Sequence, residues 1–111
     1  MPTLTAENNA TTTAAAASLI AKASAGVLWG LTGYNAKTSA QFIQVHDSAS
    51  LPADTTGVPK VVFTVAASSN FALDFGSHGR KFANGITVCN SSAYATKTIG
   101  SADCWFDVQY I

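Results

Sequence analysis

The feature of this sequence that most constrains its fold is the alternation of apolar and polar residues along several short runs. Within 61–65 the odd-numbered residues are Val, Phe and Val, and Thr64 lies between them on the other side of an extended chain. The runs 41–45, 71–75 and 103–111 alternate in the same way. A period of two residues is typical of an antiparallel sheet with one buried and one solvated face.

Clusters of Gly, Pro, Asn and Ser separate these runs, as expected for strands joined by turns. The predicted strands are 19–24, 27–34, 40–46, 60–66, 71–75, 85–90 and 103–111. Only the Ala-rich segment 14–21 has high helix propensity, and it is short. The pattern predicts an all-β fold, either an antiparallel β-sandwich or a jelly-roll-like barrel.

The chain has 111 residues, enough for one domain with one core. Residues 1–17 are a low-complexity stretch of Thr, Ala and Asn in which only Leu4 could anchor the chain. We predict a flexible N-terminal arm over 1–17, which is either a free tail or a segment ordered by a neighbouring molecule. Residues 18–111 are predicted to form a single β-domain.

The composition is 48% hydrophobic and only 11% charged, against about 25% charged in ordinary globular domains. The net charge is zero, so the surface is weakly protected against association, and a homo-oligomer is expected. The six basic residues are scattered, with only Arg80 and Lys81 adjacent, so nucleic acid is not an expected partner. The sequence contains no secretion signal and no apolar run that could span a membrane, which predicts synthesis in a cytoplasm and no membrane partner.

The residues that could carry chemistry do not form a recognisable catalytic pattern. His46 and Asp47 are adjacent on a predicted strand, so they point to opposite faces and His46 is expected at a strand rim. His78 is expected in a surface turn, and Asp74 is expected to face solvent or to bind a loop amide. We therefore predict no catalytic residue, no metal site, no cofactor and no enzymatic activity.

Cys89 and Cys104 are the only cysteines of the chain. Ile86 and Val88 are predicted to face the core, which places Cys89 on the opposite side, whereas Cys104 shares the buried side with Phe106. The two thiols are therefore predicted not to form a disulfide.

Aromatic residues on strands are the strongest binding signal. Trp105 takes the non-core position of its strand, so it is either an interface anchor or is covered by the arm. The candidate interface residues are Trp29, Tyr34, Trp105, Arg80, Lys81 and Leu4.

Several segments together resemble a group of small virion proteins of tailed bacteriophages. They include 25–35 with the sequence AGVLWGLTGYN, 41–47 with QFIQVHD, 70–76 with NFALDFG, 79–86 with GRKFANGI and 97–106 with KTIGSADCWF. The resemblance covers most of residues 22–111, and size, strand pattern and arm are most similar to capsid decoration (cement) proteins.

The resemblance implies a virion structural protein that binds the major capsid protein, or another virion protein, and stabilises the head. Closed symmetry favours a trimer on quasi-threefold sites, with a dimer as the other possibility. A tail, baseplate or fibre-associated module that binds a host-surface glycan through Trp29 or Trp105 is an alternative. A small hydrolase is the third class.

Overall fold

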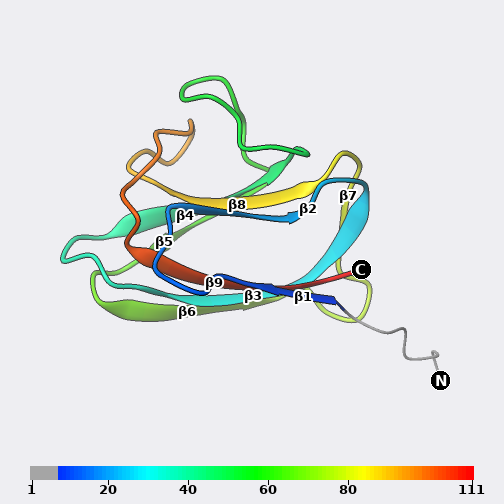
Figure 1. Cartoon of the computed structure of the whole chain (residues 1–111), viewed down its shortest axis with the longest axis horizontal. Helices are drawn as coiled ribbons and strands as arrows, with labels where there is room; N and C mark the ends of the chain where they lie inside the picture. The colour runs from blue at the N-terminus through cyan, green and yellow to red at the C-terminus, as the bar shows by residue number, and fades with distance from the viewer. Residues whose placement is uncertain (1–7) are drawn as a thin grey trace.

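The computed structural model describes residues 8–111 and shows two antiparallel sheets packed face to face (Figure 1). No residue of this range is helical. The strands are β1 (Asn8–Thr11), β2 (Ser18–Lys22), β3 (Gly26–Asn35), β4 (Gln41–Asp47), β5 (Val61–Val65), β6 (Ser69–Asp74), β7 (Arg80–Phe82), β8 (Ile86–Ser91) and β9 (Cys104–Tyr110). The prediction of an all-β fold is confirmed, and the architecture is a β-sandwich.

The first sheet has the strand order β1-β9-β3-β6, with β7 paired to the start of β3. The second sheet has the order β2-β8-β4-β5. Strands that follow one another in the sequence often lie in different sheets (Figure 1). The connections from β1 to β2, from β3 to β4 and from β8 to β9 each pass from one sheet to the other. The central pair of the first sheet, β3 with β9, therefore joins segments far apart in the sequence.

The core lies between the inner faces of the two sheets. In the regular parts of the strands, alternate residues reach it, as the period of two predicts. Aromatic rings cross the layer, and Phe63 of the second sheet packs edge-on against Phe71 of the first at a centroid distance of 5.6 Å. The buried hydrophobic residues of this cluster are Ala21, Leu28, Leu31, Ile43, Val45, Val65, Phe71, Phe82, Ile86, Val88, Cys104, Phe106 and Val108.

All seven predicted strands are present, with ends shifted by a few residues. The sequence does not predict the short strands β1 and β7, because neither has an alternating apolar pattern long enough to detect. The helix propensity of 14–21 is overridden, since residues 18–22 pair with β8 as a strand. Backbone pairing at a sheet edge satisfies the same amide groups and also buries Ala21.

Part of the segment predicted as a flexible arm belongs to the sandwich. β1 pairs antiparallel with β9, and the amides of Thr12 and Ala16 donate to the carbonyls of Phe106 and Cys104 at 3.0 and 2.7 Å. This pairing covers the open edge of β9, which explains why a polar segment is ordered there. Residues 1–7, including Leu4, lie outside the described part of the chain.

Cys89 and Cys104 are both free and buried, so the prediction that they are not bridged is confirmed. Cys104 lies in the core, whereas Cys89 lies on the outer side of the second sheet, with its sulfur 4.0 Å from Gln44 Oε1. Opposite strand parity keeps the two thiols on different faces.

Gly33 of β3 is a point of close approach inside the first sheet. It pairs with Phe71 on one side and with Phe106 on the other, and those two rings pack at a centroid distance of 6.3 Å. A Cβ at this position would lie 2.0 Å from the carbonyl oxygen of Trp105 and 2.4 Å from Cζ of Phe71. A backbone atom is one of the obstacles, so the clash requires the sheet itself to shift.

We predict that Gly33→Ala destabilises the domain, because the added methyl group forces β3 away from β9. Overpacking of a well-packed site typically costs about 1–3 kcal/mol, which corresponds to a melting temperature lower by roughly 5–15 °C in a domain of this size. Thermal unfolding followed by circular dichroism measures the change. Thr38→Ala, in the exposed bend after β3, is the control and should melt like the unchanged protein; equal melting of Gly33→Ala would contradict the argument.

Candidate functional site

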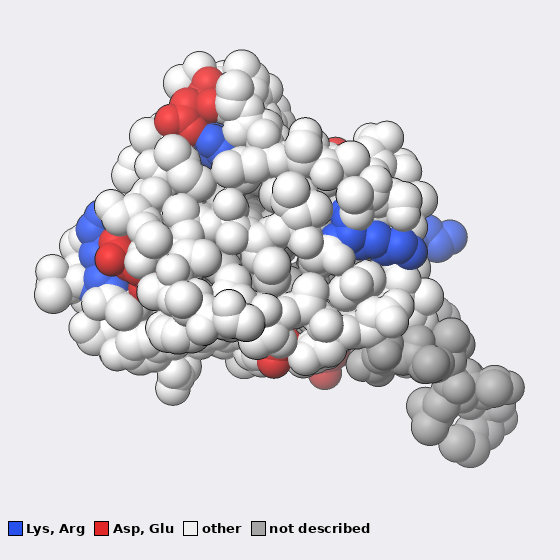
Figure 2. Space-filling view, in the orientation of Figure 1, with Lys and Arg blue, Asp and Glu red and all other residues white. Residues whose placement is uncertain are grey.

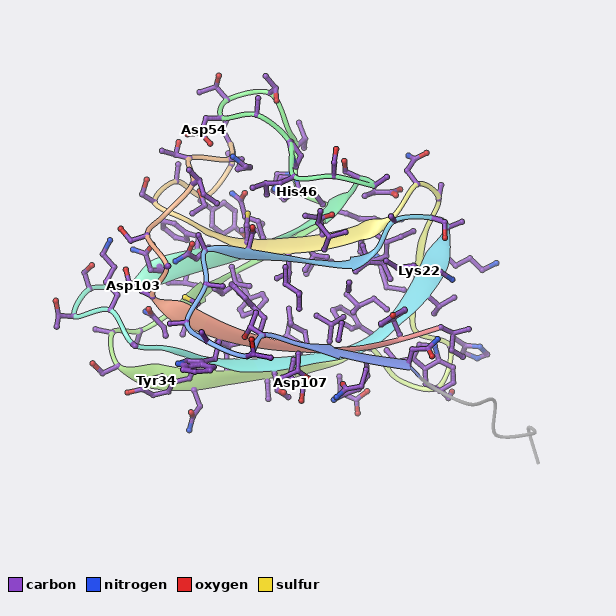
Figure 3. The ribbon with its side chains drawn as sticks, viewed as in Figure 1. Lys22, Tyr34, His46, Asp54, Asp103 and Asp107 are labelled. Atoms are coloured by element: carbon purple, nitrogen blue, oxygen red, sulfur yellow. The ribbon has the colours of Figure 1, made fainter. Side chains whose placement is uncertain are left out.

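The outer face of the first sheet combines aromatic and polar side chains. The strand registers arrange it in three cross-strand rows. The rows are Asn9, Gln109, Gly30 and Asp74; then Thr11, Asp107, Thr32 and Ala72; then Trp105, Tyr34 and Asn70. Asp74 and Asp107 are the only charged residues in these rows, and Asp107 projects away from the second sheet (Figure 3).

The third row forms an aromatic end patch, defined here as Trp105, Tyr34 and Asn70. Tyr34 is directly opposite Trp105 on β9 and Asn70 on β6. Trp105 is 42% exposed, while Tyr34 is partly buried. The patch therefore brings together two of the predicted interface residues.

Trp29 reaches the same face through a β-bulge. Leu28 pairs with Tyr110 and Gly30 pairs with Gln109, so Trp29 is an extra residue between two consecutive pairs. A bulge of this kind bends the strand and redirects a side chain. It also explains why Leu28 and Leu31, three residues apart, are both fully buried, which a regular strand does not permit.

A pocket of about 320 Å³ opens beside this bulge. Its lining includes Trp29, Gly30, Thr32, Ala72, Asp74 and Gln109. The sequence indicates Trp29 as an interface residue but gives no signal for the pocket, because the bulge depends on how β3 pairs with β9.

Arg80 and Lys81 do not join the aromatic end patch. They lie on β7, beside Leu28 and Val27 at the end of β3 that curves toward the second sheet (Figure 1). Tyr34 is six or more residues away along β3, which is roughly 20 Å for an extended strand. The guanidinium of Arg80 donates to the carbonyl of Lys60 at 3.4 Å, so it spans from one sheet toward the other.

The outer face of the second sheet differs, because two loops cover it and bury its polar side chains (Figure 3). These buried side chains are Gln44, His46, Thr87, Cys89 and Ser91. The amide nitrogen of Gln44 donates to the backbone carbonyls of Ala93, Tyr94 and Thr96, each at 3.0 Å. One side chain therefore fixes the loop that follows β8.

His46 is 2% exposed, so its predicted place at an exposed strand rim is wrong. The loop around Gly57 covers the imidazole and leaves no room for a side chain there, since a Cβ on Gly57 would lie 3.1 Å from the ring. Gln44 Oε1 lies 3.0 Å from His46 Nε2, and because the amide oxygen can only accept, we assign the proton to Nε2.

The buried polar cluster holds its groups in the uncharged form. Burial, assisted by the positive charge of Lys97, lowers the pKa of His46. Burial raises the pKa of the Cys89 thiol to about 11, so almost none of it is thiolate near neutrality. A buried thiol and a buried neutral imidazole are suited to holding loops in place, not to nucleophilic chemistry.

Carboxylates fix the loops on both sides of this cluster. Lys97 is 2% exposed and forms an ion pair with Asp54, whose carboxylate also accepts from the Ile99 amide at 3.1 Å. The Lys97 ammonium group beside Asp54 lowers the pKa of that carboxyl. Asp47 accepts from three consecutive backbone amides, at residues 83–85, and these hydrogen bonds lower its pKa.

Two further expectations are confirmed. Asp74 is exposed and its Oδ1 accepts from the Gly76 amide at 2.8 Å, so it binds a loop amide as predicted. His78 lies in an exposed turn.

Within residues 8–111, no three His, Cys, Asp or Glu side chains are grouped closely enough to hold a metal ion, and no helix is long and apolar enough to cross a membrane.

No family model, curated protein or solved structure matches this chain.

The buried imidazole generates a prediction about pH. His46 has a lowered pKa in the folded protein, so the unfolded chain binds more protons below about pH 6.5, the ordinary pKa of histidine. The contribution of neutral His46 to the free energy of unfolding is therefore fully present above that pH and decreases as the pH falls toward 5. Asp47 and Asp54 have pKa values lowered from 3.8, so they contribute to acid unfolding only at lower pH.

We expect His46→Gln to be less stable than the unchanged protein at pH 7 but to lose less stability between pH 7 and pH 5. Melting temperatures across this range measure the effect, and each kcal/mol corresponds to roughly 4–8 °C. His78→Gln, in the exposed turn, is the control and should keep the original pH profile. A profile that is unchanged in His46→Gln would show that another group controls the transition.

Proposed function

We propose that this protein is a structural protein of a bacteriophage virion, most similar to a capsid decoration protein, and that it acts without catalysis. It would be made in the host cytoplasm, bind the major capsid protein or another virion protein, and stabilise the particle. The resemblance of its sequence segments to small virion proteins motivates the proposal. The buried, uncharged His46 and Cys89 are consistent with a structural role.

The observation that supports attachment most directly is the aromatic end patch. Trp105 is exposed next to Tyr34 at one end of the first sheet, and none of the three patch residues is charged. Most of the surface visible in Figure 2 is likewise uncharged, with Lys, Arg, Asp and Glu confined to small groups. Trp and Tyr are the residue types that most often dominate binding energy at protein interfaces.

Attachment through one end patch would be strengthened by oligomerisation. Several linked copies bind a symmetric lattice more strongly than one, since later contacts are intramolecular. We propose a homo-oligomer, with a trimer favoured over a dimer because quasi-threefold positions recur across capsid lattices. The molar mass in solution, measured by light scattering during size-exclusion chromatography, distinguishes these states from a monomer.

We predict that Trp105→Ala weakens binding to the particle by about 30-fold or more, as for an interface tryptophan worth roughly 2–4 kcal/mol. The measurement is co-sedimentation of the purified protein, at increasing concentration, with phage particles that lack this protein. Tyr94→Ala is a matched control, because Tyr94 is 52% exposed but lies on the loop over the second sheet.

Two results would overturn the proposal. Absence of the protein from gradient-purified phage particles grown in the natural host would show that it is not a component of the virion. Equal binding of Trp105→Ala and the unchanged protein, with both folded by circular dichroism, would show that attachment uses a different surface.

A further inference from the structure

The pocket at the bulge of β3 is a second feature of the outer face, separate from the aromatic end patch. Gly30 and Tyr34 are four residues apart on β3, which places the two features about 13 Å from each other. The pocket is lined by Asp74 and Gly76, so it lies where β6 ends and the loop 75–79 begins. The pocket and the end patch are therefore distinct parts of the same outer face.

The bulge and a glycine together create the hollow. The bulge leaves Trp29 unpaired beside Gly30, which pairs with Gln109, so an aromatic side chain lies next to a position that has no side chain. A Cβ on Gly30 would lie 2.5 Å from Oε1 of Gln109 and 3.5 Å from the carbonyl oxygen of Leu73. The side chain of Gln109 therefore extends over Gly30, and any larger residue at 30 would fill this floor.

The pocket lining combines an aromatic wall with one carboxylate and several neutral donors and acceptors. Asp74 uses Oδ1 to accept from the Gly76 amide, which holds the carboxylate in place. The Gln109 amide and the Thr32 hydroxyl supply both donor and acceptor groups. The volume of about 320 Å³ is at the small end of the range for ligand sites.

We propose that this pocket binds one neutral hexose unit, such as the terminal sugar of a glycan. The apolar face of a sugar ring can pack on Trp29, while its hydroxyls, which both donate and accept, can pair with Asp74 and Gln109. No Lys or Arg lines the pocket, and the Asp74 carboxylate repels an anion. A cationic side chain only donates, so it would leave the amide donors of Gln109 without a partner.

This assignment gives a location to the sugar-binding alternative considered from the sequence. It does not depend on the virion proposal, because it concerns the isolated protein. A sugar site that stays exposed on an attached protein would present the particle to carbohydrate at a cell surface.

The experiment uses the fluorescence of Trp29. The chain has two tryptophans, so in Trp105→Phe the tryptophan emission comes from Trp29 alone. This variant is titrated with D-glucose, D-galactose, D-mannose and N-acetyl-D-glucosamine, and with D-glucuronate and arginine amide as anionic and cationic probes. At least one neutral sugar should give a saturable change with a dissociation constant of about 1–10 mM, as expected for a ligand of this size.

Two variants in the Trp105→Phe background test the location. Gly30→Ala fills the floor without removing a polar group, and Asp74→Asn keeps an oxygen that can accept from Gly76 but removes the charge. Each should weaken binding by about tenfold, as for loss of a well-placed contact. Thr11→Ala, on the same face but outside the pocket, is the control and should bind normally. Circular dichroism verifies that each variant is folded.

Three outcomes would overturn the proposal. The first is no saturable change with any neutral sugar up to about 100 mM, well above the expected range. The second is binding of arginine amide that equals or exceeds the best sugar, which would identify a pocket for a cationic protein side chain. The third is sugar binding that Gly30→Ala and Asp74→Asn leave unchanged, which would place the sugar elsewhere.

Discussion

Contact between the inner faces of the two sheets is the interaction on which the other features depend. Leu28 and Leu31 on the first sheet, with Ile43 and Val88 on the second, are fully removed from solvent. A chain of this length builds one core, so each strand must present its apolar side to the same layer. That requirement fixes every register, because a slip of one residue would turn the apolar side outward. The side chains that do not face the core lie on the outer faces of the sheets, and the candidate sites are formed there.

The bulge in β3 is a consequence of that requirement. Leu28 and Leu31 can both reach the core only if the strand contains one extra residue between them. The extra residue is Trp29, which is thereby placed next to Gly30 on the side facing away from the core. The pocket and the packing of the first sheet thus share a single cause.

The two outer faces of the sandwich differ in how loops cover them. Loops close over the second sheet, where Gln44 and His46 form a buried polar network that fixes the loops. Buried polar groups are stabilising only when their hydrogen bonds are made, so this face is committed to internal contacts. On the first sheet Trp105 is 42% exposed, which is why binding is proposed there.

The alternation in the sequence determined the all-β class, the seven main strands and the opposite sides of Cys89 and Cys104, because side-chain direction in a strand is a local property. Tertiary structure decided the rest. The strand β1 exists because β9 offers an open edge, and His46 is buried because a distant loop folds over it. Trp29 borders a pocket because β3 pairs with β9 through a bulge. Each of these depends on contact between segments far apart in the chain, and such contacts have no period in the sequence from which they could be predicted.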